Sequence, residues 1–90
     1  MDLGLQGKVA LVAASSKGLG KACALGLARE GAKVSMCSRD GAAIRAAADD
    51  VAGATGAEAL ALPGDVRQAE VCEQLVADTV RRFGRLDILV

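Results

Sequence analysis

The sequence predicts an α/β protein in which a parallel sheet is covered by helices on both faces. Short apolar runs alternate with segments of helical periodicity, in the order strand, helix, strand, helix, strand, helix, strand. This alternation implies right-handed crossovers between parallel strands. The apolar residues are nearly all Ala, Val and Leu, with Phe83 as the one aromatic residue, and small aliphatic side chains suit strands buried on both faces. Ninety residues suffice for one small domain.

The first strand is predicted over residues 8–13, KVALVA, a short apolar run buried on both faces. A helix follows, because apolar or small residues recur at i, i+3, i+4, i+7 and i+8. These residues are Leu19, Ala22, Cys23, Gly26 and Leu27. Their small side chains predict a helix that lies close to the sheet. Gly31 is a suitable C-cap for it.

The second strand is predicted over residues 33–39, KVSMCSR. The helical spacing then returns in a second set of apolar residues: Ile44, Ala47, Ala48 and Val51. Gly53 and Gly56 are expected to loosen the chain after this helix. Residues 58–62, EALAL, predict a third strand that ends at Pro63 and Gly64.

The third helix is predicted from six residues at helical intervals: Cys72, Leu75, Val76, Thr79, Val80 and Phe83. Arg81 and Arg82 lie near its negative end, and Gly84 is placed to cap it. Residues 86–90, LDILV, open a fourth strand. Because a domain seldom finishes on an uncovered apolar strand, we expect the chain to be the front part of a longer protein.

Composition argues against several classes of function. Eleven basic residues balance eleven acidic ones, so no nucleic-acid surface is expected. The chain has no histidine and its three cysteines form no C-x-x-C pair, so no metal site is expected. No segment is apolar over the length of a signal peptide or a membrane span. We therefore expect no membrane partner, and a soluble cytoplasmic protein with buried, reduced thiols.

Residues 14–20, ASSKGLG, form a glycine-bearing turn between the first strand and the first helix. Such a turn exposes backbone N–H groups at the positive end of a helix dipole, where phosphate binds readily. A doubly wound fold places a dinucleotide pyrophosphate at this point. The alternative is a simple turn in which Ser15 or Ser16 helps to cap the helix.

The end of the second strand bears on the choice of cofactor. Dinucleotide folds use an acidic residue there for a ribose 2′-hydroxyl, or an arginine for a 2′-phosphate. Here the strand ends in Ser38 and Arg39, and Lys17 is placed to supply a second positive charge. Each of these residues alone also fits a solvated surface position. Together they favour NADP over NAD.

Asp65 follows the third strand in the tetrapeptide PGDV. It is expected either to cap the third helix or to make a polar contact with adenine. The two roles are compatible.

These residues resemble the short-chain dehydrogenase/reductase family. The family's loop reads Thr-Gly-x-x-x-Gly-x-Gly, and residues 13–20, AASSKGLG, match its spacing and its last two glycines. The resemblance continues through REGAKVSMCSRD at 29–40, GDV at 64–66 and FGRLDILV at 83–90. It is strongest to the 3-oxoacyl-acyl-carrier-protein reductase branch. Ala13 and Ala14 depart from the family pattern, and alanine at a positive φ costs on the order of 1 kcal/mol or more.

The resemblance implies a Rossmann-type doubly wound sheet, of which residues 1–90 are the N-terminal NAD(P)-binding part. It implies ten cofactor-binding residues: Ser15, Ser16, Lys17, Gly18, Leu19 and Gly20 at the pyrophosphate and ribose phosphate, Ser38 and Arg39 at the 2′-phosphate, and Asp65 and Val66 at adenine.

The resemblance also implies what is absent. Family members transfer hydride between a nicotinamide and a carbonyl or alcohol, with a tyrosine as the general acid/base. The chain contains no tyrosine, so we assign no catalytic residue to it and place the catalytic part outside it. The expected whole protein is an NADP-dependent oxidoreductase, a homo-oligomer that acts on a small-molecule or acyl-carrier-linked substrate. The alternative is a nucleotide-binding module without catalytic activity.

Overall fold

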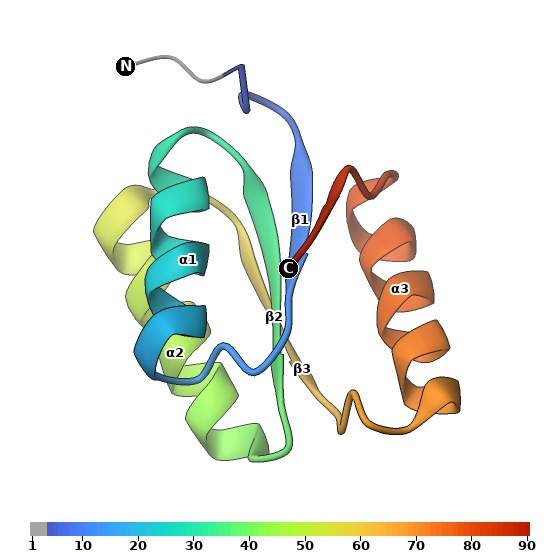
Figure 1. Ribbon diagram of the computed structural model, residues 1–90. Helices are drawn as coiled ribbons and strands as arrows, with labels where there is room; N and C mark the ends of the chain where they lie inside the picture. Colours follow the sequence, from blue (N-terminus) through green and yellow to red (C-terminus); the bar gives the residue numbers. More distant parts are fainter. Residues whose placement is uncertain (1–3) are drawn as a thin grey trace.

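The fold is seen in a computed structural model that describes residues 4–90. The first three residues of the predicted domain lie outside this range. The strands are β1 (Val9–Val12), β2 (Lys33–Ser38), β3 (Ala59–Pro63) and β4 (Ile88–Leu89), and the helices are α1 (Gly18–Arg29), α2 (Gly41–Thr55) and α3 (Ala69–Phe83). The strands form one parallel sheet in the order β3-β2-β1-β4. Helices α1 and α2 cover one face and α3 covers the other (Figure 1). The predicted fold class is confirmed.

The element ends differ from the predicted ones at several glycines and at the proline. Gly53 lies inside α2, which ends with Gly56 at a φ of 76° as its C-cap. The C-cap of α1 is Glu30, and Gly31 follows it with a φ of 96°. Pro63 is the last residue of β3. A proline is tolerated there because β3 is an edge strand, and the next residue, Gly64, donates to the Ser38 carbonyl at 2.8 Å.

The larger core lies between the sheet and the α1–α2 layer. It joins alternate residues of β1 and β2 with the inner face of α2, and its buried members are Ala10, Val12, Ala24, Ala28, Val34, Met36, Ile44, Ala47, Ala48 and Val51. The predicted inner face of α2 is confirmed residue for residue. Alanines on both helices allow close packing onto the sheet.

The predicted inner face of α1 is wrong in part. Cys23 and Leu27 pack against the core as expected, but Leu19 is 81% exposed, and the fully buried residues of the helix are Ala24 and Ala28. The helix is therefore rotated relative to the apolar pattern. The cause is a close backbone contact at its first turn, described with the site below.

The second core, beneath α3, is smaller. Its fully buried members are Leu11, Cys37 and Leu75. Of the predicted face of α3, Leu75 and Thr79 are buried, whereas Val80 is 41% exposed. All three cysteines are free, but only Cys37 is buried, so the expectation of buried thiols holds for one of them. Burial raises the pKa of the Cys37 thiol.

A buried pair of hydroxyl groups joins α3 to the sheet. Thr79 donates to the Ser35 hydroxyl at 2.9 Å, and the same Thr79 oxygen lies 2.8 Å from the Leu75 carbonyl. Both side chains are fully buried. Thr79 is therefore the one hydrogen-bond partner of the Ser35 hydroxyl among the described residues, whereas the Thr79 hydroxyl also contacts the backbone of its own helix.

We expect Thr79→Val to lower the free energy of unfolding by about 1–3 kcal/mol, because it keeps the side-chain shape and leaves the Ser35 hydroxyl buried with no partner on α3. Adding Ser35→Ala removes that unsatisfied group, so the double variant should recover part of the loss. Urea unfolding followed by circular dichroism measures both. A double variant whose loss equals the sum of the two single losses would contradict the coupling.

Candidate functional site

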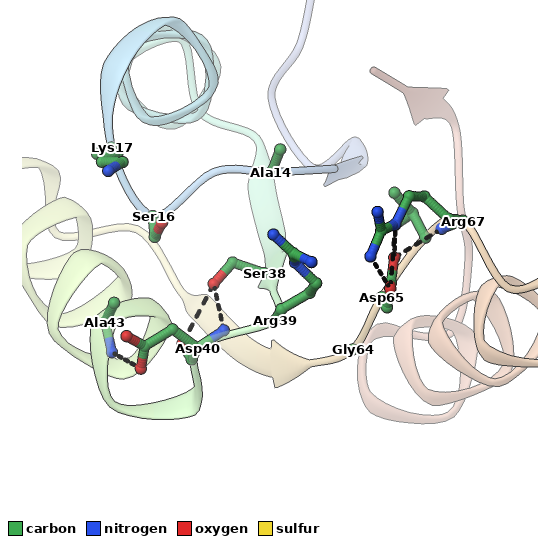
Figure 2. A pocket seen from close by; sticks show the side chains of 11 residues that line it. Ala14, Ser16, Lys17, Ser38, Arg39, Asp40, Ala43, Gly64, Asp65 and Arg67 are labelled. Atoms are coloured by element: carbon green, nitrogen blue, oxygen red, sulfur yellow. Dashed lines mark hydrogen bonds and ion pairs between the residues drawn. The ribbon is translucent and has the colours of Figure 1, made fainter.

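A pocket of about 510 Å³ opens at the carboxyl ends of β1, β2 and β3 (Figure 2). We call it the carboxyl-edge pocket. Three loops line it with the residues Ala14, Ser16, Lys17, Ser38, Arg39, Asp40, Ala43, Gly64, Asp65, Val66 and Arg67. Its size lies within the range of small-ligand sites.

The loop from β1 to α1 is held by a close contact between two stretches of backbone. A methyl group built on Gly20 would overlap the carbonyl oxygen of Ala14 and lie 3.0 Å from its carbonyl carbon. Only glycine fits there. Because Gly20 lies in the first turn of α1, this contact orients the helix and explains why Ala24 and Ala28 face the sheet.

Ala14 adopts a left-handed backbone conformation, with a φ of 50°. It is the one non-glycine residue with positive φ in the described range. An L-residue with a Cβ atom pays about 1–2 kcal/mol there. The strain anticipated for this position is present, and the fold tolerates it at the pocket wall.

Ser15 is fully buried behind this loop. Its hydroxyl donates to the Val12 carbonyl at 2.8 Å and accepts from the Cys37 N–H at 3.1 Å. Its own N–H donates to the Cys37 carbonyl at 3.0 Å. The side chain therefore ties the end of β1 to the end of β2, and it neither lines the pocket nor caps α1.

No side chain among residues 4–90 caps the N-terminus of α1, so the alternative in which Ser15 or Ser16 caps the helix is wrong. The N-cap is Lys17, and the first helical hydrogen bond runs from the Lys21 N–H to the Lys17 carbonyl at 3.4 Å. The preceding N–H groups, those of Gly18, Leu19 and Gly20, belong to the first turn and have no acceptor within the helix. This end of α1 can attract an anion.

Ser38 and Asp40, at the end of β2, are engaged with each other and with α2. The Ser38 hydroxyl accepts from the Asp40 N–H at 3.1 Å, and the Asp40 carboxylate caps α2 by accepting from the Ala43 N–H at 3.1 Å (Figure 2). A carboxylate committed to a cap competes less for a ribose hydroxyl. Arg39, between them, is exposed and forms no hydrogen bond or ion pair with any residue in 4–90.

Asp65 and Arg67 form a multidentate ion pair at the end of β3. Arg67 Nη2 lies 2.8 Å from Asp65 Oδ2, and Arg67 Nε lies 3.1 Å and 3.2 Å from the two carboxylate oxygens. These bonds, with one from the Arg67 N–H and the nearby charge of Arg39, lower the pKa of the Asp65 carboxyl to about 2. The pair's contribution to folding stability is present above about pH 4 and is lost as the pH falls toward 2.

The predicted cap of α3 by Asp65 is wrong, because the N-cap is Gln68 and has no side-chain partner. The carboxylate turns toward Arg67 instead. Arg67 is the site residue that the sequence interpretation missed. The sequence indicates this pair through an aspartate and an arginine two residues apart, directly after the third strand.

Six of the ten predicted cofactor-binding residues line the carboxyl-edge pocket: Ser16, Lys17, Ser38, Arg39, Asp65 and Val66. Gly18, Leu19 and Gly20 form the adjoining start of α1, and Ser15 lies behind the loop. Both carboxylates of the pocket are already bonded, to Ala43 and to Arg67. The uncommitted charge is therefore positive, which suits a phosphate-bearing ligand.

Residues 4–90 bear on two further possibilities, a metal-ion site and a membrane-spanning helix. They contain no group of three or more His, Cys, Asp or Glu side chains that could hold a metal ion. Within the same range, no helix is both long and apolar enough to cross a membrane.

Comparison with known proteins shows similarity over nearly the whole chain and not only at the short motifs. The family model for short chain dehydrogenase matches residues 8–90. A 3-oxoacyl-[acyl-carrier-protein] reductase of Synechocystis is 42% identical over 89 residues, which cover 96% of this chain and 35% of that protein. The chain spans about a third of the length of the curated relatives it matches.

Solved structures with the same fold hold either of two cofactors. The L-sorbose reductase of Gluconobacter frateurii, complexed with NADPH and L-sorbose, matches with a TM-score of 0.94 and 36% identity over 99% of this chain and 34% of that one. A xylitol dehydrogenase bound to NAD⁺ matches with a TM-score of 0.89 and 34% identity over 96% of this chain and 33% of that one.

We expect Gly20→Ala to lower the free energy of unfolding by about 1–3 kcal/mol, because the added methyl group forces the Ala14 carbonyl and α1 apart. Gly26→Ala is the matched control, since Gly26 lies in the same helix with nothing within 4 Å of an added Cβ. The control should gain up to about 1 kcal/mol from helix propensity. Chemical denaturation measures both, and equal shifts would show that the contact is not restrictive.

Proposed function

Because the chain belongs to the short chain dehydrogenase family, we propose that it is the N-terminal cofactor-binding part of an NADP-dependent oxidoreductase. The whole protein would transfer hydride between NADPH and a carbonyl or alcohol. The observation that carries the proposal is the carboxyl-edge pocket, where an uncapped helix N-terminus adjoins Arg39, a cation that forms no ion pair within residues 4–90.

The residues present fit a dinucleotide. Backbone N–H groups at the start of α1 would hold the pyrophosphate, because Gly20 allows the loop to lie close against the helix. Arg39 would meet a 2′-phosphate with a guanidinium that has no hydrogen-bond or ion-pair partner in the described part of the chain. Ser16, Lys17 and Val66 complete the proposed contacts from the pocket wall. When bound, the nicotinamide would supply the hydride.

Two observations favour NADP over NAD. Arg39 forms no hydrogen bond or ion pair within residues 4–90, whereas Asp40, the nearest carboxylate in sequence to the end of β2, is bonded to the N-terminus of α2. A ribose 2′-hydroxyl would thus lack a free acidic partner at this position, while a 2′-phosphate would find a free cation. The NADPH complex of L-sorbose reductase is consistent with this choice.

The acid/base residue would lie in the part of the protein outside these 90 residues, since they include no tyrosine. In this proposal residues 1–90 are the first part of a single Rossmann domain. The substrate would be a small carbonyl compound or an acyl-carrier-linked one, by similarity to the Synechocystis reductase. A homo-oligomer in the cytoplasm remains our proposal, and the three free thiols fit a reducing compartment.

The second candidate is a nucleotide-binding module without catalysis, which the strained Ala14 at the pocket wall favours. The two candidates differ in whether hydride is transferred. We expect the protein expressed from the whole reading frame that contains these residues to oxidise NADPH in the presence of a β-ketoester. Loss of absorbance at 340 nm measures the reaction. Tight NADPH binding with no turnover across a panel of carbonyl substrates would favour the module.

For cofactor choice, we expect Arg39→Asp to raise the KM for NADPH at least tenfold and to change that for NADH little, because only NADPH carries the 2′-phosphate. Steady-state kinetics with both cofactors measure the two values, and NADH serves as the internal control for folding. Equal effects on the two cofactors would remove the assignment to NADP.

A further inference from the structure

The turn that leaves β1 contains a residue in an unfavourable backbone conformation. Ala14 is the third residue of a turn that runs from Val12 to Ser15, and its φ is 50°. A turn with positive φ at its third residue ordinarily has glycine or asparagine there, because a Cβ atom is disfavoured in the left-handed region. An alanine in this place relaxes to negative φ unless its surroundings hold it. The contacts that hold Ala14 are therefore part of the site.

Ser15 supplies such contacts on the strand side of the turn. Its hydroxyl donates to the Val12 carbonyl at 2.8 Å, so the side chain closes the turn around Ala14. The same hydroxyl accepts from the Cys37 N–H at 3.1 Å, and the Ser15 N–H donates to the Cys37 carbonyl at 3.0 Å. Ser15 is fully buried, which strengthens these bonds because water does not compete for them. Both ends of the turn are thereby fixed to the sheet.

The turn also contacts the helix that the proposed function uses. The Ala14 carbonyl is packed so closely against Gly20, in the first turn of α1, that a methyl group on Gly20 would overlap it. A change of φ at Ala14 moves this carbonyl, which then either displaces the start of the helix or loses the contact. The position of the first-turn N–H groups of α1 therefore depends on Ala14, and through it on Ser15.

We propose that Ser15 is a positioning residue for dinucleotide binding, which holds Ala14 in the left-handed conformation and so keeps the first turn of α1 in place for the pyrophosphate. The inference rests on the proposed dinucleotide function. Ser15 acts through Ala14 and does not contact the ligand, because it is buried behind the loop and does not line the carboxyl-edge pocket. The dependence exists because residue 14 is an alanine, since glycine adopts a positive φ without support.

Calorimetric titration of the protein expressed from the whole reading frame, with NADPH and with NADH, tests this role. We expect Ser15→Ala to weaken the binding of both dinucleotides by about fivefold to thirtyfold, which is the cost of left-handed alanine expressed as a loss of the binding-competent population. The ratio of the two dissociation constants should stay as in the wild type, because the pyrophosphate is common to both ligands. Arg39→Asp, in contrast, should change that ratio.

Ala14→Gly separates positioning from a general effect on stability. In the Ala14→Gly background, Ser15→Ala should leave both dissociation constants within about twofold, because glycine needs no support at this φ. This comparison holds even if Ser15→Ala alone fails to fold. Ser35→Ala is the matched control, since Ser35 is also a fully buried serine of this sheet but is hydrogen-bonded to Thr79 on α3. It should lower stability and leave both dissociation constants unchanged.

The outcomes separate this role from the proposed function. A folded Ser15→Ala protein that binds both dinucleotides as the wild type does overturns the inference and leaves the proposed function standing. A loss that persists in the Ala14→Gly background overturns it as well, because the hydroxyl then does not act through Ala14. A loss that is absent from that background and from Ser35→Ala supports the inference. Failure of the wild type to bind either dinucleotide overturns the proposed function, and the inference with it.

Discussion

The contact between Gly20 and the carbonyl of Ala14 is the constraint on which the rest of the site depends. It holds the start of α1 against the loop that leaves β1, at a separation that a side chain on residue 20 would prevent. This orientation turns Ala24 and Ala28 toward the sheet and leaves Leu19 in solvent. It also brings the uncapped end of the helix beside the carboxyl ends of the strands. The strain at Ala14 is the local cost of this arrangement.

Buried side-chain hydrogen bonds form a second set of interactions, which connect the ends of the strands to one another and to α3. Ser15 bonds to the backbone of both β1 and β2, so the two strand ends that form the pocket floor cannot separate without breaking buried hydrogen bonds. On the opposite face, Thr79 and Ser35 join α3 to β2. These polar pairs supplement a core of small side chains, in which Met36 and Ile44 are among the largest fully buried residues.

The charge that the pocket offers a ligand depends on which of its charged side chains already have partners in the protein. The chain is neutral overall, with eleven basic and eleven acidic residues. Both pocket carboxylates are nevertheless already bonded, Asp40 to the N-terminus of α2 and Asp65 to Arg67, while Arg39 forms no hydrogen bond or ion pair in the described range. A neutral chain thus presents free positive charge at one edge of its sheet. Net charge alone carries no such information, because it does not say which charges are already satisfied.

The sequence by itself determined the order of strands and helices, the fold class, the inner face of α2 and the three loops that line the pocket. Those features depend on local periodicity and on the rule that parallel strands end at one edge of a sheet. Only the tertiary structure decided the rotation of α1, the burial of Ser15 and the pairing of Asp65 with Arg67. The first two features depend on backbone atoms from another segment, and the third depends on the direction that a side chain takes. The spacing of residues along the chain specifies neither the contacts between segments nor the direction of a side chain. The glycine pattern at residues 18–20 predicted a phosphate loop, but the reason Gly20 must be glycine is a carbonyl six residues away that the fold brings into contact.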